Sequence, residues 1–411
     1  MPSRRGWAAF SAGIGLWIGA RFAGSPDLHM VAVGVLAMPF LAALFVQWNR
    51  LRLNIHRHLS SVRVFPGTRV VVTLTVENRG PGTAPFLLLE DSLPPSLGKP
   101  ARVVVSGIPA QGSERVSYSV LCRQRGRFTL GPVSVTVTDP FGLAHVNIRI
   151  ADTNDLIVYP QVEDIPASEL SLHGAGFGDS SSRQLYRSAA EFYTMREYVT
   201  GDDLRRIHWP SVARTGQLMI RQDEATRRSA ATVFLDNRTL TLGSAGSQGF
   251  ERAVSAAASM GRALLRAGFA VRLASVDAPA QPMGEERLLE TLAGATATRE
   301  RGFGGALAAL RGSALAESTL VVVTAPPVGT EVEMLQRFGA RFGRKVVVLV
   351  LPVRLDALSA EAASEMQGRI RAAVTMLRGS RWKVCVLPPN GRLAEEWKNT
   401  TIRRPLTVSS S

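Results

Sequence analysis

The residues best suited to chemistry lie in one short stretch, MREYVTGDDLRRIHWPSVARTGQLMIRQDE, from Met195 to Glu224. It combines carboxylates, arginines and one imidazole. A histidine oriented by a carboxylate can act as a general base, and His208 follows Asp202 and Asp203 closely. Arginines can also bind carboxylates through paired hydrogen bonds, which fixes a segment without acting on a substrate. The stretch therefore allows a catalytic and a structural interpretation.

The catalytic interpretation lacks partners for His208. None of the six histidines lies beside a recognisable serine or cysteine nucleophile motif, and none has the spacing of a metal-ligand motif such as H-E-x-x-H. The glycine-rich stretch from Gly174 to Arg183 lacks the Lys-Ser/Thr end of a phosphate loop, so we interpret it as a connector. We therefore predict that the chain is not an enzyme and needs no cofactor. The alternative is a hydrolytic or other enzyme site assembled around His208 and neighbouring carboxylates.

The structural interpretation starts from turn and helix signals in the same stretch. Gly201 supplies a turn, Asp202 or Asp203 can cap the following helix, and Pro210 can open a second short helix. Charged residues of both signs surround this turn and could clasp the stretch to the domain that follows. They are Glu191, Glu197, Asp202, Asp203, Asp223 and Glu224 on one side, and Arg196, Arg205, Arg206, Arg214 and Arg221 on the other. Such an ion-pair clasp requires no substrate.

The stretch also resembles the signature of the bacterial domain-of-unknown-function 58 family, whose pattern runs R-x-Y-x-x-G-D-D-x-R-x-I-x-W-x-x-x-A-R. The matching residues are Arg196, Tyr198, Gly201, Asp202, Asp203, Arg205, Ile207, Trp209, Ala213 and Arg214. The upstream segment RGRFTLGPVSVTVTDPFGL is similar to the β-domain of that family. Many members of the family carry a lysine where this chain has Pro210. We therefore do not expect this chain to make the contact that the lysine makes in those members.

The resemblance covers nearly the whole chain, and it implies an architecture and a partner. It implies a hairpin anchor, a β-domain and a carboxy-terminal domain similar to a von Willebrand factor A module. Members of the family commonly accompany MoxR-type AAA+ ATPases, which are thought to assemble or mature other complexes. The resemblance therefore implies such an ATPase as the partner, with ATP bound by the partner and not by this chain.

The composition is that of globular domains with an excess of positive charge. The 411 residues include 48 Lys plus Arg against 33 Asp plus Glu, a formal net charge of +15. Only four of the basic residues are lysines, a skew that indicates the codon bias of a GC-rich genome. Because the arginines are spread along the chain without aromatic clusters, we predict no nucleic-acid partner. Cys122 and Cys385 form neither a disulfide framework nor a metal motif.

The amino-terminal segment has the length and hydropathy of a membrane anchor. Leu28 to Trp48 is a run of 21 residues without Asp, Glu, Lys or Arg. At about 1.5 Å per residue, such a helix spans a hydrocarbon core of roughly 30 Å. Trp7 to Ala20 is a shorter apolar run, which can span if Arg21 reaches the headgroups. We predict a transmembrane hairpin that turns at residues 24–27 and contacts lipid over residues 7–48.

Charges beside the two apolar runs predict their orientation. Arginines precede the first run and follow the second, and they are Arg4, Arg5, Arg50, Arg52, Arg57 and Arg63. The positive-inside rule then places both ends of the hairpin, and the soluble domains, in the cytoplasm. If the first run is instead a cleaved signal peptide, the second run still leaves residues 53 onward in the cytosol. We therefore predict a multi-pass protein of the cell membrane.

Residues 53–162 have the pattern of a small all-β domain. In the run TRVVVTLTVENRG, Val70, Val72, Leu74 and Val76 share one face, as the period of two in a half-buried strand requires. Similar short runs, bounded by Gly, Pro, Asn or Asp, recur as far as NDLIVYP. This spacing predicts an antiparallel β-sandwich, in which the glycines and Asp139 form turns.

Residues 227–411 alternate apolar strands with helices. The strand-like runs are at 231–236, 270–276, 319–325, 345–351 and 383–388. Because such continuous apolar strands are typical of parallel sheets covered on both faces, we predict a doubly wound α/β domain. Its similarity to a von Willebrand factor A module follows from the family resemblance. Between this domain and the sandwich, residues 163–226 form a linker with the signature stretch, and residues 1–52 are the anchor.

The residues at the end of the first predicted strand of the α/β domain indicate whether the domain carries a metal site. Many von Willebrand factor A modules carry D-x-S-x-S there, which presents oxygen ligands to Mg²⁺. This chain has Asp236, with Arg238 and Leu240 in place of the two serines. We therefore interpret Asp236 as the remnant of a metal site that caps a helix or pairs with an arginine, and we predict no metal. Together these patterns predict a membrane-anchored, non-enzymatic adaptor or scaffold that works with a MoxR-type ATPase; a metal-dependent adhesion-type module is a further alternative.

Overall fold

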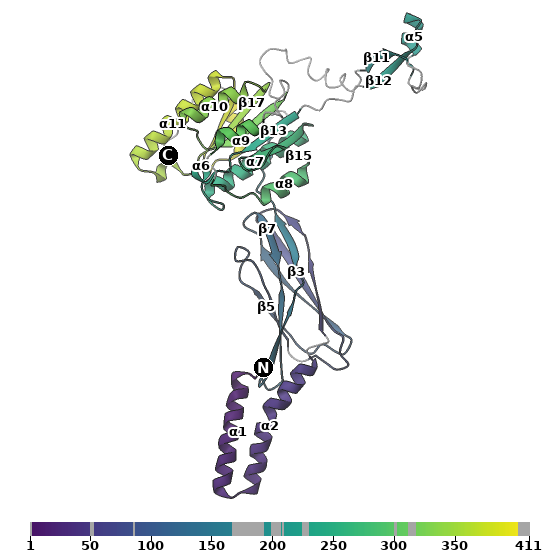
Figure 1. Ribbon diagram of the computed structural model, residues 1–411, viewed down its shortest axis with the longest axis vertical. Coiled ribbons are helices and arrows are strands. Elements are labelled where there is room, and N and C mark those ends of the chain that lie inside the picture. The colour runs from purple at the N-terminus through teal and green to yellow at the C-terminus, as the bar shows by residue number, and fades with distance from the viewer. Residues whose placement is uncertain are drawn as a thin grey trace. The chain divides into compact units, whose positions relative to one another are not determined.

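The computed structural model describes residues 2–49, 53–84, 87–166, 193–198, 207, 209–223, 230–299, 302–310 and 318–401. The chain divides into two compact units (Figure 1). The first comprises Met1–Gln161 with Leu289–Ala295, and the second comprises Val162–Leu288 with Thr296–Ser411.

Two helices begin the first unit, α1 (Arg4–Ala23) and α2 (Pro26–Asn49). The Ser3 side chain caps α1 by accepting a hydrogen bond from the Gly6 amide, and Gly24 ends the helix in the left-handed conformation at φ 62°. The helices lie side by side and antiparallel (Figure 1). They approach closely at Gly13, where an added Cβ would lie 2.9 Å from the Leu36 side chain.

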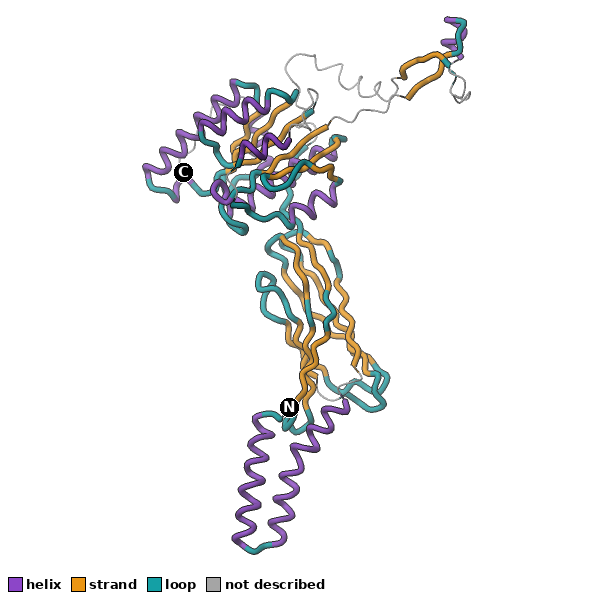
Figure 2. The backbone as a smooth tube through the Cα atoms, in the orientation of Figure 1, coloured by secondary structure: helices purple, strands orange, loops and turns teal. Residues whose placement is uncertain are grey.

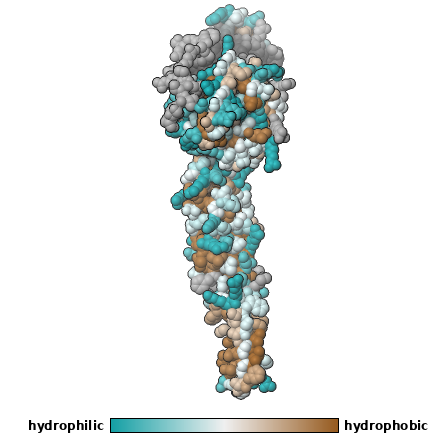
Figure 3. Space-filling model, turned by 90° about the vertical axis from the view of Figure 1, so that its left-hand side faces the viewer, coloured by the Kyte–Doolittle hydropathy of each residue, from teal (hydrophilic) through white to brown (hydrophobic). Residues whose placement is uncertain are grey.

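Helix α2 carries the apolar segment predicted from the sequence. Among the described helices, it alone is long and apolar enough to cross a membrane, over Pro26–Gln47 with a mean hydropathy of 2.2. Large apolar side chains point outward from it, with Phe40 65% exposed and Met30 73% exposed. Figure 3 shows hydrophobic surface gathered on the helical pair. The apolar helix near the amino terminus is thus confirmed, whereas a second membrane span stays a prediction.

The rest of the first unit is built from short strands in three sheets, ordered β1-β3-β6, β5-β4-β8-β9 and β2-β10-β7. The strands are β1 (Leu53–Leu59), β2 (Arg63–Val64), β3 (Arg69–Asn78), β4 (Leu87–Asp91), β5 (Ala101–Val105), β6 (Ser113–Leu121), β7 (Gly126–Leu130), β8 (Val133–Thr138), β9 (His145–Ile150) and β10 (Asn154–Val158). The predicted β-rich part is confirmed, and Val70, Val72, Leu74 and Val76 are at most 1% exposed.

Two features of these sheets differ from the prediction. The pairing is antiparallel except between β2 and β10, which run parallel. Strand β2 has two residues and pairs with a strand distant in sequence, so no tight turn fixes an antiparallel direction. In addition, Arg57 was counted among the charges flanking the membrane, but it lies on β1, buried and paired with Asp91 at 2.7 Å. Its charge is therefore neutralised inside the β-unit.

A six-stranded sheet in the order β15-β14-β13-β16-β17-β18 forms the core of the second unit (Figure 2). The strands are β13 (Ala230–Leu235), β14 (Ala270–Ser275), β15 (Gln281–Met283), β16 (Thr319–Thr324), β17 (Arg344–Val350) and β18 (Lys383–Leu387). All neighbours pair in parallel except β15, a short antiparallel edge strand that the sequence patterns did not predict. The predicted α/β content is confirmed.

Helices cover both faces of this sheet. They are α6 (Thr239–Leu242), α7 (Gln248–Arg266), α9 (Phe303–Ala309), α10 (Gly329–Gly339), α11 (Ala360–Gly379) and α12 (Leu393–Thr401), while α8 (Glu285–Ala293) begins in this unit and ends in the first. Helix α7 packs on β13, β14, β16 and β17. On the other face, Leu307, Leu335 and Val374 of α9, α10 and α11 join Phe234 and Val322 in one buried cluster. Because β13 and β16 are parallel neighbours, their carboxyl ends lie side by side at one edge of the sheet.

Candidate functional site

The structure describes part of the signature stretch. Strands β11 (Tyr193–Glu197) and β12 (Met219–Asp223) pair antiparallel, with Arg196 opposite Ile220. The Tyr198 amide donates to the Leu218 carbonyl at 2.8 Å and continues the ladder. These strands were not predicted, because each is five residues long and lacks an apolar run.

Helix α5 (Trp209–Thr215) lies between the two strands in the chain. It begins one residue before Pro210, which agrees with the predicted short helix at that residue. Trp209 is 66% exposed, Ala213 and Arg214 are exposed, and Ile207 is half-buried.

The centre of the motif lies outside the described residues. This applies to Gly201, Asp202, Asp203 and Arg205, and also to His208. Both the ion-pair clasp and the alternative role of His208 as a base therefore stay predictions.

The second candidate site lies where β13 and β16 end. Asp236 directly follows β13 and is fully buried. Thr324, the last residue of β16, is 1% exposed, and its hydroxyl donates to Asp236 Oδ2 at 2.7 Å. The two residues meet because β13 and β16 are parallel neighbours, with Leu235 opposite Val323. The sheet thus positions a carboxylate and a hydroxyl at its carboxyl edge.

Arg238 binds the Asp236 carboxylate through two parallel hydrogen bonds. Its Nε donates to Oδ1 at 2.8 Å and its Nη2 donates to Oδ2 at 2.9 Å. The third nitrogen, Nη1, donates to Glu331 Oε1 at 2.6 Å, at the first turn of α10. The guanidinium also lies 4.6 Å from the centre of the Phe303 ring. The interpretation that Asp236 pairs with an arginine agrees with this arrangement.

The charges of this cluster stabilise one another in a buried position. Burial alone would lower the pKa of Arg238, but the hydrogen bonds and negative charges of Asp236 and Glu331 outweigh it and raise the pKa above its ordinary value. The Arg238 side chain is 6% exposed and stays charged. Glu331 lies in the first turn of α10, where the positive end of the helix dipole favours a carboxylate. The cluster is therefore a closed ion-pair network.

The side chain of Asn237 forms hydrogen bonds to two loops next to the network. Its side-chain oxygen accepts from the Val276 amide at 3.1 Å, while its amide nitrogen donates to Asp277 Oδ1 at 2.9 Å and to the Thr296 carbonyl at 3.0 Å. The sequence motifs indicate no role for Asn237 or Glu331. Glu331 lies 93 positions after Arg238, and no sequence signal connects the two.

The residues at this edge do not fit a divalent metal of the von Willebrand factor A type. Such a site needs Asp236 and two hydroxyl oxygens to face the cation. Here Arg238 occupies both carboxylate oxygens, and Leu240 is 71% exposed at the second serine position. Among the described residues, no group of three His, Cys, Asp or Glu side chains could hold a metal ion.

We expect calorimetric titration of the purified protein with Mg²⁺ or Mn²⁺ to give no submillimolar binding at this edge. A cation would have to displace a guanidinium that two carboxylates already hold. Submillimolar binding that the Asp236→Ala substitution abolishes would contradict this expectation.

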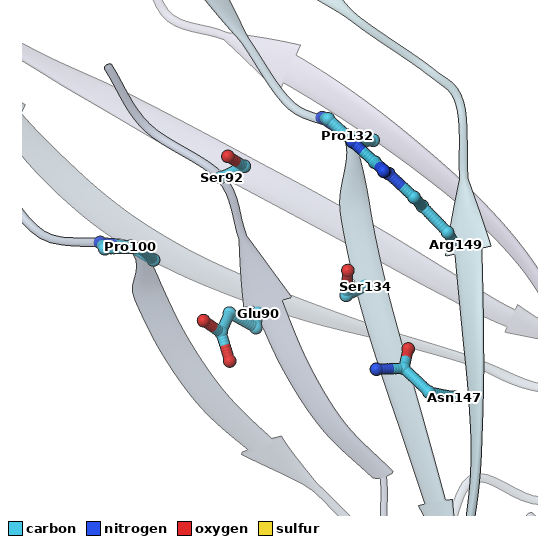
Figure 4. A pocket seen from close by; sticks show the side chains of 7 residues that line it. All are labelled: Glu90, Ser92, Pro100, Pro132, Ser134, Asn147 and Arg149. Atoms are coloured by element: carbon cyan, nitrogen blue, oxygen red, sulfur yellow. The ribbon is translucent and has the colours of Figure 1, made fainter. Parts of the chain in front are cut away.

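An open polar groove of about 400 Å³ lies on the β5-β4-β8-β9 sheet of the first unit. Figure 4 shows the residues that line it, which are Glu90, Ser92, Pro100, Pro132, Ser134, Asn147 and Arg149. Glu90 is engaged by Arg102 at 3.1 Å. The lining offers hydroxyl, amide and charged groups for polar contacts, and its carboxylate is already paired with Arg102.

The two cysteines are poor nucleophiles. Both thiols are free and fully buried. Burial raises the pKa of Cys122, and mainly burial raises the pKa of Cys385 to about 12. Because the thiolate is the reactive form, neither side chain is activated for catalysis.

Comparison with known proteins finds a family match in the central region. Residues 194–350 match the model of the family described as "Protein of unknown function DUF58". The match includes the signature stretch and the Asp236 network, so the family resemblance of the sequence is confirmed over these residues. The chain is also 26% identical over 250 residues to "Uncharacterized protein YeaD" of Bacillus subtilis (strain 168). That alignment covers 58% of this chain and 60% of YeaD, less than two thirds of the relative.

Two solved structures resemble the chain weakly. The CARDB domain of a Pyrococcus furiosus protein is 16% identical and gives a TM-score of 0.21, covering 26% of this chain and 91% of that chain. The C-terminal domain of wzt is 9% identical and gives a TM-score of 0.22, covering 28% of this chain and 78% of that chain. Similarities at this level support no conclusion about fold or function.

Proposed function

We propose that this chain, which carries a DUF58 region over residues 194–350, is a membrane-anchored protein-interaction adaptor without catalytic activity of its own. The observation that carries the proposal is the closed network of Asp236, Arg238 and Glu331. It fills the carboxyl edge of the sheet, the usual place for a ligand in an open α/β fold, with groups that satisfy one another. A sealed edge suits a rigid recognition module better than an active site.

The sheet supports a von Willebrand factor A-like assignment for the second unit. Its parallel strands, the single antiparallel edge strand and the buried aspartate after β13 are consistent with the module that the family resemblance implies. In this chain the guanidinium of Arg238, in place of a metal ion, supplies the positive charge that binds Asp236. We propose that the domain recognises its partner without metal.

The anchor gives the adaptor its location. We propose that α1 and α2 form a membrane hairpin and that the domains after it face the cytoplasm, because arginines flank both outer ends of the pair. Confinement to a membrane raises the effective concentration of the module for clients at that membrane. An adhesion or receptor role would need the opposite orientation.

A MoxR-type AAA+ ATPase is the partner that we propose, from the family resemblance. We expect the ATPase to be recovered when the crosslinked full-length protein is purified from its own cells. Charge reversal in the signature stretch, by Arg205→Glu or Asp202→Lys, should reduce the recovered ATPase several-fold. The matched control is Arg337→Glu, whose side chain is 83% exposed on α10 and pairs with Glu333. No ATPase with the unaltered protein would contradict the proposal.

A further inference from the structure

The loop between β8 and β9 has a fixed shape. Asp139 is 4% exposed, and its two carboxylate oxygens accept from the amides of Phe141 at 2.9 Å and Ala144 at 2.6 Å. The Gly142 amide donates to the Asp139 carbonyl at 3.0 Å, and Gly142 has φ 70°. These bonds set the direction of Phe141, which is 70% exposed at the tip.

The same loop is joined to the beginning of α1. The Ser3 amide donates to the Leu143 carbonyl at 2.8 Å, and the Ser3 hydroxyl donates to the Gly142 carbonyl at 2.6 Å. At Gly6, in the first turn of the helix, an added Cβ would lie 2.2 Å from the Leu143 carbonyl oxygen. The loop therefore packs directly against the first turn, with no room for a side chain.

Helix α2 enters the β-unit at the same end. Ala42 and Val46 are 7% and 2% exposed, and they share one core cluster with Val137, Leu143 and Ala144. One face of the last turns of α2 thus packs in the core of the β-unit, whereas Leu44 and Phe45 on the same turns are 60% and 41% exposed. The apolar surface of the helices begins next to this end of the β-unit, so no spacer separates the loop from the membrane-facing helices.

The side chains exposed at this level have the composition of a membrane interface. Phe141 and Trp7 are 70% and 60% exposed, and Arg4 and Arg5 are exposed beside them at the beginning of α1. An added Cβ on Gly142 would lie 3.7 Å from the Arg5 guanidinium, so Arg5 lies over the loop. Tryptophan is enriched at the headgroup level, phenylalanine occurs on the apolar face of segments that lie at a membrane surface, and arginines attract anionic lipids.

We propose that the loop Asp139–Ala144, with Phe141 at its tip, is a second membrane contact that rests on the anionic surface of the bilayer. This inference rests on the proposed anchoring by α1 and α2. The loop would hold the β-unit against the membrane at a fixed height, since it is bonded both to its own carboxylate and to the first turn of α1. The β-domain then rests on the membrane surface through this loop.

The test measures the depth of a fluorescent label at position 141. The Phe141→Cys variant of the full-length protein is labelled with an environment-sensitive nitrobenzoxadiazole and reconstituted in phosphatidylcholine–phosphatidylglycerol vesicles. Cys122 and Cys385 are fully buried, so they give little background labelling. We expect lipids with a nitroxide on the headgroup to quench this label several-fold more than a label at Val62→Cys. Val62 is a matched control, 51% exposed and just beyond the far end of β1.

Two further labels separate this inference from the proposed anchoring. A label at Phe40→Cys, 65% exposed in the middle of α2, reports insertion of the helix, and nitroxides deep in the acyl chains should quench it. If the label at position 40 is quenched but the label at position 141 is quenched no more than the label at position 62, the loop contact is overturned and the anchor is retained. Absence of quenching at both 40 and 141 would overturn the anchor and the loop contact together. Pro140→Cys, also exposed, provides a second probe of the loop.

Discussion

The Arg238→Met variant should lose about 3–5 kcal/mol in the free energy of unfolding of the α/β unit, the range for removing one partner of a buried ion pair. Methionine keeps much of the volume but leaves Asp236, fully buried, without its cationic partner. Glu331 loses its partner as well, but it is partly exposed and can be solvated. We therefore attribute most of the expected loss to Asp236.

Hydrogen exchange of the β13 and β16 amides under increasing denaturant measures this loss locally, so unfolding elsewhere in the chain does not obscure it. The control is Arg337→Met on α10, where an exposed i,i+4 pair with Glu333 is worth about 0–1 kcal/mol.

A double variant distinguishes an unpaired charge from lost packing. Asp236→Asn removes the negative charge, while its side-chain oxygen can still accept the hydroxyl of Thr324. In the background of Arg238→Met, we expect this second substitution to restore a large part of the stability, because the buried charge is then gone. If the two losses simply added, the buried charge would not be the cause, and Arg238 would act through its packing on Phe303.

The sequence predicted elements whose pattern is local. The alternation in β3 placed Val70 and Val72 in the core, and the continuous apolar runs located the parallel strands of the second unit. It also predicted that Asp236 caps a helix or pairs with an arginine, and the structure identifies Arg238 as that arginine. Features that depend on distant segments were missed. Glu331 joins the network only through the fold, and β15 has too few residues for a recognisable pattern.

A buried acid in β4 shows where the same local reasoning could have gone further. In the run LLLED, the period of two that buries Leu87 and Leu89 also turns Asp91 inward and Glu90 outward. An inward carboxylate needs a cationic partner, and that requirement points to an arginine on a neighbouring strand. Which arginine fills the role depends on the packing of β1 against β4, and the sequence patterns do not contain it.

The structure identifies Arg57 as that partner, at the centre of a network in the β-unit. Its Nε and Nη2 donate to the two oxygens of Asp91 at 3.0 and 2.7 Å, and neither side chain is exposed. Nη1 donates to the carbonyls of Leu130 and Asp152 and to the side-chain oxygen of Asn154, each at 3.1 Å. One guanidinium therefore joins β1, β4, the end of β7 and the beginning of β10.

Tyr118 completes this network from β6. Its hydroxyl donates to Asp91 Oδ2 at 2.5 Å. Burial, and then the hydrogen bond to Asp91, raise the pKa of Tyr118 above its ordinary value, so the hydroxyl keeps its proton. Tyr118→Phe removes one hydrogen bond to a charged acceptor without removing a charge. This substitution should therefore cost less than loss of the Asp91 charge.

Asp91→Asn should destabilise the β-unit by about 3–5 kcal/mol, because Arg57 is then left charged, buried and without a carboxylate. The neighbouring Glu90→Gln makes the same chemical change on the outward face, where the pair with Arg102 is largely exposed, and should cost about 0–1 kcal/mol. Hydrogen exchange of the β4 and β8 amides measures both. Similar losses for the two variants would show that the inward charge has no special role. A large loss at 91 alone would establish that buried electrostatics, together with the apolar core, hold β1, β4, β6 and β10 in register.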